Sequence, residues 1–123
     1  MALNNKMEYV YKSNNEHPKS IAIAKDPSYE NLAHFLTYDI YTSDLFSEAI
    51  LEAIDKVAHD GTKPELVSLN SKKLLIYKDQ TTIHWFDAPL QPRSGEFPPL
   101  VTIATQELRQ ALEEWKLHIQ KNS

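Results

Sequence analysis

The feature that most constrains the fold of this chain is a change in the spacing of its apolar residues. Short segments before residue 41 and between residues 66 and 104 are rich in β-branched and aromatic side chains, as strands are. In two longer segments the apolar residues instead recur at steps of three and four, which is typical of amphipathic helices. Strands that come in runs, without strict alternation with helices, favour an α+β fold with an antiparallel sheet.

The strand-like segments are short and separated by polar, turn-rich sequence. They cover residues 8–12, 20–25, 34–41, 66–69, 73–78, 82–87 and 100–104. We predict a strand over residues 34–41 because apolar and polar residues nearly alternate there. The segments between residues 66 and 87 lie so close together that an antiparallel meander is expected.

Two helices are predicted from the longer pattern. The first carries Phe46, Ile50, Ile54 and Val57. It follows Thr42-Ser43-Asp44, whose side chains can accept backbone N–H bonds, and it is expected to stop at Asp60-Gly61, before Pro64. The second helix covers residues 105–119, with Thr105 as its expected cap, and carries Leu108, Leu112, Trp115 and Ile119.

These elements predict the order βββ-α-ββββ-α in a single domain covering residues 1–123. The expected architecture is an antiparallel sheet of about five to seven strands with two main helices packed on it. Residues 88–99 hold four of the seven prolines and are expected to form an extended surface loop, because proline is a poor member of a sheet interior.

Composition excludes several classes of function. The formal charge of −4 disfavours non-specific nucleic-acid binding, which requires a basic patch. The absence of cysteine removes thiolate catalysis and cysteine-ligated metal sites, and two glycines are too few for a phosphate-binding loop. No segment approaches the ~18 apolar residues that span a bilayer, and residues 1–7 do not resemble a signal peptide. We therefore expect a cytoplasmic protein.

The histidines raise the question of a metal or catalytic site. They are His17, His34, His59, His84 and His118, and none of them lies in an HxH, HxxxH or HExxH arrangement. We therefore expect no metal site and no cofactor. A histidine and a carboxylate that are distant in sequence leave no spacing signature. A small enzyme that acts on nucleic acid or a nucleotide through His84 or His34 thus stays open as an alternative.

One electrostatic feature exceeds the background. Between Asp39 and Glu65 lie seven acidic residues and two lysines, a local charge of −5. Four of these acids fall at helical spacing on the face opposite the apolar residues and are called here the acidic stripe: Asp44, Glu48, Glu52 and Asp55. The stripe is either a solvated helix face or a docking surface for a basic partner, which complementary charge would steer and orient.

The proline-rich segment is a second candidate surface. Arg93 and Phe97 lie within residues 88–99, and a segment stiffened by proline loses little entropy on binding. These two side chains are therefore candidate contacts with a protein partner. The alternative is that the segment only connects its neighbouring elements.

In overall plan the chain resembles the immunity proteins that protect bacteria from contact-dependent or polymorphic toxins. The resemblance rests on an acidic single domain, a strand-rich middle and a terminal amphipathic helix with Trp115 among leucines. It implies a cytoplasmic protein that binds its cognate toxin domain, often a basic nuclease, and blocks it without any cofactor. Such proteins have many folds, so no site residue is carried over.

Overall fold

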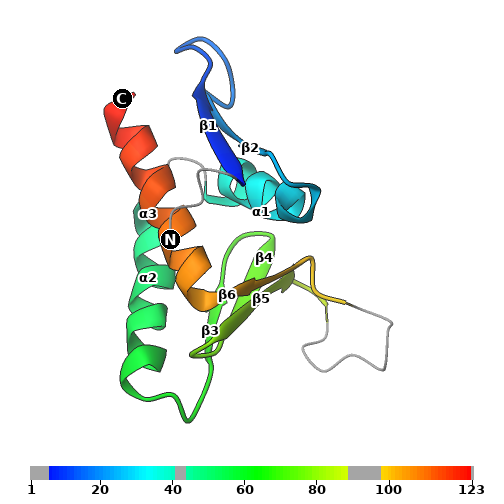
Figure 1. Cartoon of the computed structure of the whole chain (residues 1–123), viewed down its shortest axis with the longest axis vertical. Helices are drawn as coiled ribbons and strands as arrows, with labels where there is room; N and C mark the ends of the chain where they lie inside the picture. Colours follow the sequence, from blue (N-terminus) through cyan, green and yellow to red (C-terminus); the bar gives the residue numbers. More distant parts are fainter. Residues whose placement is uncertain (1–5, 41–43, 89–97, 123) are drawn as a thin grey trace.

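The computed structural model describes residues 6–40, 44–88 and 98–122, and shows an α+β protein with two antiparallel sheets (Figure 1). A two-stranded hairpin is formed by β1 (Met7–Tyr11) and β2 (Ser20–Ala24). Four further strands form a second sheet, and the expectation of one continuous sheet is therefore wrong. The α+β class and the antiparallel pairing are confirmed.

The segment after the hairpin is helical, which corrects the strand predicted over residues 34–41. It consists of a 3₁₀ turn, η1 (Pro27–Tyr29), the short helix α1 (Glu30–His34) and a wider π-helical turn, η2 (Phe35–Ile40). Asp26 begins it by accepting a hydrogen bond from the Ser28 backbone N–H.

The alternation along this segment was misleading because burial does not follow its two apparent strand faces. Phe35 and Leu36, on opposite faces, are both almost inaccessible to solvent, whereas Tyr38, on the same face as Leu36, is 59% exposed. A helical repeat is visible once the segment is extended backwards, since Leu32, Leu36 and Ile40 follow at steps of four and are all buried. Asp26-Pro27 is the start signal that would have indicated a helix.

The middle of the chain follows the predicted order of a helix and a meander. Helix α2 (Asp44–His59) is followed by β3 (Glu65–Ser68), β4 (Lys72–Ile76) and β5 (Gln80–Trp85), each antiparallel to its neighbour. Strand β6 (Val101–Ala104) pairs with β5 and completes the order β3-β4-β5-β6. The boundaries differ from the predicted ones by about two residues or fewer, the usual uncertainty at element ends.

The last helix, α3 (Thr105–Lys121), was predicted from its apolar spacing and is confirmed. Thr105, however, is its first helical residue and not its cap, because Ala104 holds the N-cap position without a side-chain hydrogen bond. The Thr105 hydroxyl instead donates to the Tyr77 carbonyl at 2.7 Å and lies 2.8 Å from the Thr81 hydroxyl. It thus ties the start of α3 to the turn between β4 and β5.

Helices α2 and α3 lie side by side against one face of the four-stranded sheet, and the hairpin and α1 lie beyond its end (Figure 1). Buried side chains from all of these elements form one hydrophobic cluster, which extends from Met7 on β1 to Trp115 on α3. Within the described residues, no helix is both long and apolar enough to span a membrane.

Candidate functional site

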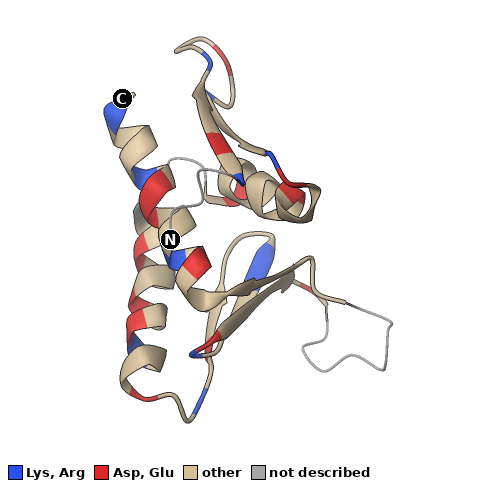
Figure 2. Ribbon diagram, in the orientation of Figure 1, with Lys and Arg blue, Asp and Glu red and all other residues tan. Residues whose placement is uncertain are grey.

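The acidic stripe lies on the solvent side of α2. Ile50, Ile54 and Val57 are buried on the opposite side of the helix, against the sheet and α3, and they fix its rotation. Glu48, Glu52 and Asp55 therefore project to the surface, where all three are exposed. Asp44 begins the helix, but its side chain lies outside the described part of the structure. Figure 2 shows acidic residues repeated along the outer side of α2.

The stripe is only partly neutralised by neighbouring cations. Asp55 forms an ion pair with Arg109 of α3, and Glu52 lies 3.8 Å from the Lys56 ammonium. Glu48 has no ion-pair partner among the described residues. Exposed pairs of this kind contribute little to stability and exchange readily with water or another cation. The stripe is thus available to a competing positive charge.

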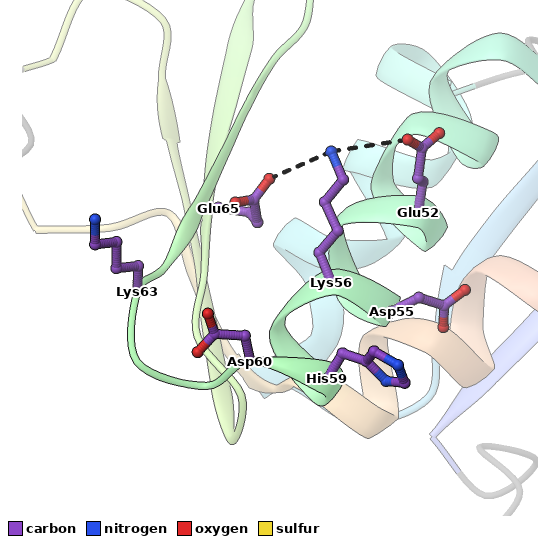
Figure 3. Close-up of a pocket in the computed structure, with 7 residues that line it drawn as sticks. All are labelled: Glu52, Asp55, Lys56, His59, Asp60, Lys63 and Glu65. Atoms are coloured by element: carbon purple, nitrogen blue, oxygen red, sulfur yellow. Dashed lines mark ion pairs between the residues drawn. The ribbon is translucent and has the colours of Figure 1, made fainter.

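An open cleft of about 560 Å³ lies between the C-terminal half of α2 and β3, and is called here the α2–β3 cleft (Figure 3). Its lining contains four carboxylates, two lysines and a histidine: Glu52, Asp55, Asp60, Glu65, Lys56, Lys63 and His59. Lys56 reaches between Glu52 and Glu65, with its Nζ at 3.8 Å and 3.9 Å from their oxygens. Sequence analysis found the stripe but not this cleft, because Glu65 joins it only through the packing of β3 beside α2.

The Asp60 carboxylate is held by its own turn at the end of the cleft. It accepts hydrogen bonds from the hydroxyl and the backbone N–H of Thr62, at 2.7 Å and 3.2 Å. These hydrogen bonds lower the pKa of Asp60 because they stabilise its ionised form. The Asp60 carboxylate therefore stays ionised, and the cleft keeps its negative charge, when the pH falls well below neutral.

Arg93 and Phe97, the two partner-binding candidates of the proline-rich segment, lie outside the described residues.

The two histidines considered for catalysis are not joined to carboxylates in the described part of the chain. His84 is 5% exposed on the sheet face away from the helices, and its Nε2 lies 2.8 Å from the Thr82 hydroxyl, while its Nδ1 has no hydrogen-bond partner among the described residues. Burial lowers its pKa, and the nearby Lys73 lowers it further. The His34 ring lies against the Tyr38 ring in a tilted arrangement, with 4.6 Å between the centroids. Among the residues that the structure describes, neither histidine is paired with a carboxylate as the enzyme alternative requires.

A histidine contact that sequence reasoning missed joins the hairpin to α3. His118 Nε2 lies 3.0 Å from the Ser20 hydroxyl, and its ring stacks on Trp115 at a centroid distance of 5.8 Å. A serine beside a histidine resembles part of a nucleophilic site, but Ser20 is 2% exposed and no substrate can reach it. Desolvation lowers the pKa of His118, Lys121 adds to this, and a hydrogen bond to the Val10 backbone partly opposes it.

A buried ion pair was also missed. Lys72 and Asp39 meet at 3.0 Å, and both side chains are almost fully buried. Asp39 accepts a second hydrogen bond from the Ser71 hydroxyl at 2.6 Å, and the Lys72 ammonium lies 4.1 Å from the centroid of the Trp85 ring. The charges compensate one another inside the protein, so this cluster carries no net charge with which to attract a ligand.

The candidate site formed by the described residues is thus a charged surface on α2 and the adjoining cleft. No group of three or more histidine and acidic side chains in residues 6–40, 44–88 and 98–122 is arranged to hold a metal ion. The chain was also compared with known proteins, and no protein-family model, curated protein or solved structure matches it.

Proposed function

We propose that this protein is a binding protein that neutralises a basic protein partner through the acidic stripe of α2. The observation that carries the proposal is that Glu48 and Glu52 are exposed on a helix whose opposite side is anchored in the core. A rigid helix presents these charges at fixed spacing, so docking orders few side chains and the long-range field steers the partner.

The partner that we propose is a bacterial toxin domain with a basic surface, such as a nuclease, and the protein would act in the cytoplasm as its immunity protein. The support is the resemblance in general plan together with the local charge of −5 between Asp39 and Glu65. Inhibition of this kind needs neither turnover nor a cofactor, because covering the active site of the toxin is sufficient.

The test begins with affinity capture from the source organism, scored for a stoichiometric basic protein, and continues with association kinetics on the captured partner. The double variant Glu48→Lys and Glu52→Lys should associate about tenfold or more slowly at low salt. Its association rate should also depend less on ionic strength. The matched control is Glu8→Lys with Glu113→Lys, which changes the net charge equally at exposed positions outside the stripe.

The control variant should keep most of the association rate, because only the general attraction of the whole molecule is reduced. If both double variants slow association equally, the stripe has no specific role and net charge alone explains the effect. If neither variant changes the rate while both fold normally, the acidic stripe is not the docking surface.

A further inference from the structure

In the part of the chain that the structure describes, the four-stranded sheet has one open edge. Its order is β3-β4-β5-β6, so β3 and β6 lie at the two edges. Beside β6 lies the helical segment that contains α1: Asn31 donates a side-chain hydrogen bond to the Leu100 carbonyl at 2.9 Å, and Tyr29 and Leu32 share a narrow cavity with the strand. Of the described strands, only β4 pairs with β3, and the other side of β3 borders the α2–β3 cleft.

The register of β3 determines which backbone groups point away from the sheet. Leu69 donates its backbone N–H to the Lys72 carbonyl at 2.8 Å, so this pair closes the turn as a hydrogen-bonded pair. In an antiparallel ladder, hydrogen-bonded and non-hydrogen-bonded pairs alternate. Val67 and Glu65 therefore bond to β4, whereas the N–H and C=O groups of Leu66 and Ser68 point outward.

The same alternation of inward and outward backbone groups holds in the hairpin. Lys12 donates to the Lys19 carbonyl, which makes Tyr9–Ala22 a non-hydrogen-bonded pair by the same alternation. The Ala22 N–H should then point away from β1, and it does so, since it donates to the Thr37 hydroxyl at 2.9 Å. At β3, no described residue outside the sheet forms a hydrogen bond with Leu66 or Ser68.

The surroundings of this edge select the chemistry of an added strand. Every second side chain of such a strand would face the α2–β3 cleft, where four carboxylates outnumber two lysines. The remaining side chains would lie beside Leu66, which is 52% exposed on the other sheet face. An arginine or lysine from outside can also displace Lys56, whose two ion pairs are long and exposed.

We propose that a basic, extended segment of the partner adds to β3 as a fifth strand, with its cationic side chains in the α2–β3 cleft. The inference rests on the proposed function and specifies how the partner docks. The edge supplies backbone hydrogen bonds for affinity, and the acidic cleft selects basic side chains at alternate positions. A second copy of this chain is disfavoured as the occupant, because it brings the same excess of carboxylates to the edge.

The experiment uses a synthetic peptide as the probe, acetyl-Thr-Lys-Val-Arg-Val-Lys-Thr-amide, and amide NMR of the full chain. Binding should slow hydrogen exchange of the Leu66 and Ser68 amides several-fold or more and should shift their signals most. A control peptide with glutamate in place of Lys, Arg and Lys should give no protection. If neither peptide slows hydrogen exchange of these two amides at millimolar concentration, the proposal that a strand adds to β3 is wrong.

A proline substitution tests the backbone directly. Leu66→Pro removes an N–H that the sheet does not use, so the protein should stay folded while peptide affinity falls on the order of tenfold. Leu66→Ala is the matched control for the lost side chain and should weaken binding only about twofold to threefold. If Leu66→Pro fails to fold, Ser68→Pro gives the same test at the other outward N–H. Equal affinity of the proline and alanine variants would overturn the proposal.

The failure of this inference is distinguishable from failure of the proposed function. One contrary outcome is that the peptide shifts only the amide NMR signals of Glu48 and Glu52 and leaves hydrogen exchange at Leu66 and Ser68 unchanged. That result overturns strand addition and leaves the acidic stripe as the docking surface. Protection at β3 that grows with protein concentration, in the absence of peptide, identifies a second copy as the occupant and also overturns the proposal. Glu48 does not line the α2–β3 cleft, so Glu48→Lys by itself tests the acidic stripe separately from strand addition, through association with the captured partner.

Discussion

At the scale of single residues, the pair of Lys72 and Asp39 has the largest consequence for stability. Both side chains are almost fully buried, so removal of one partner leaves the other charge desolvated and uncompensated. Asp39 also accepts a hydrogen bond from Ser71, which holds the carboxylate in place. The pair was invisible in the sequence because its members lie on the helical segment η2 and on strand β4, 33 positions apart.

We expect Asp39→Ala to lower the free energy of unfolding by about 3–5 kcal/mol, measured by urea denaturation. The double variant Asp39→Ala with Lys72→Met should be clearly more stable than the sum of the single effects implies, because it removes both charges. Single variants that each cost less than about 1 kcal/mol, with additive effects, would mean that water screens the pair.

Two histidines make stability depend on pH. Burial lowers the pKa of both His84 and His118 from the ordinary value of 6.5, and nearby lysines lower it further. Below pH 6.5 the unfolded chain therefore binds more protons than the folded chain, so stability is complete above this pH and falls as the solution is acidified. The melting temperature should drop between neutral pH and the lowered pKa values.

His118→Gln should reduce this pH dependence, even though the variant also loses the contact of His118 with Ser20. The measurement is the melting temperature of wild type and variant across the same pH series, compared by slope and not by absolute value. Identical slopes below pH 6.5 would show that protonation of His118 does not oppose folding.

At the scale of elements, Thr37 joins the helical segment to the hairpin. Its hydroxyl donates to the Ala33 carbonyl and accepts from the Ala22 N–H, both at 2.9 Å, and the side chain is 3% exposed. The hydroxyl thus satisfies an outward N–H of β2 in the protein interior, where an unpaired donor is costly. Through this contact the helical segment satisfies an N–H group of β2 that a third strand would otherwise have to pair.

Thr37→Val keeps the shape of the side chain but leaves the Ala22 N–H unpaired, and should cost about 1–3 kcal/mol of stability. Thr37→Ser, the matched control, retains the hydroxyl and should cost less than about 1 kcal/mol. Urea denaturation measures both, and hydrogen exchange at Ala22 should accelerate only in the valine variant. Equal losses in the two variants would assign the effect to packing of the methyl group.

At the scale of the whole molecule, the hairpin and the four-stranded sheet share α3. Tyr9 of β1 donates to Glu114 of α3 at 2.7 Å and packs near Trp115, and the buried cluster continues from there to the sheet. Burial, together with the neighbouring Glu114 carboxylate, raises the pKa of Tyr9, so its hydroxyl remains a donor throughout the physiological range. One shared core predicts that the chain unfolds as a single cooperative unit.

The two tryptophans make this prediction testable. Trp85 lies at the end of β5 in the four-stranded sheet, whereas Trp115 lies where the hairpin meets α3. In Trp85→Phe and Trp115→Phe variants, the fluorescence of the remaining tryptophan should follow the same urea transition as circular dichroism. A fluorescence midpoint that departs from the dichroism midpoint in either variant would reveal two separately unfolding parts.

Local sequence pattern was sufficient to identify the elements whose burial follows that pattern. Helices α2 and α3 bury one side only, so their apolar spacing identified them, and the short polar turns of the meander indicated antiparallel pairing. It also located the acidic stripe, because exposed charges at steps of three and four need no tertiary contact to share a helix face.

The tertiary structure alone decided what depends on contacts between distant segments. The segment from α1 to η2 is buried on several sides, so its apolar pattern imitated a strand until its neighbours were known. The split into two sheets, the buried pair of Lys72 and Asp39 and the open edge of β3 follow from which elements pack together. Spacing along one segment reports which face is apolar, but it carries no information about the segment that covers that face.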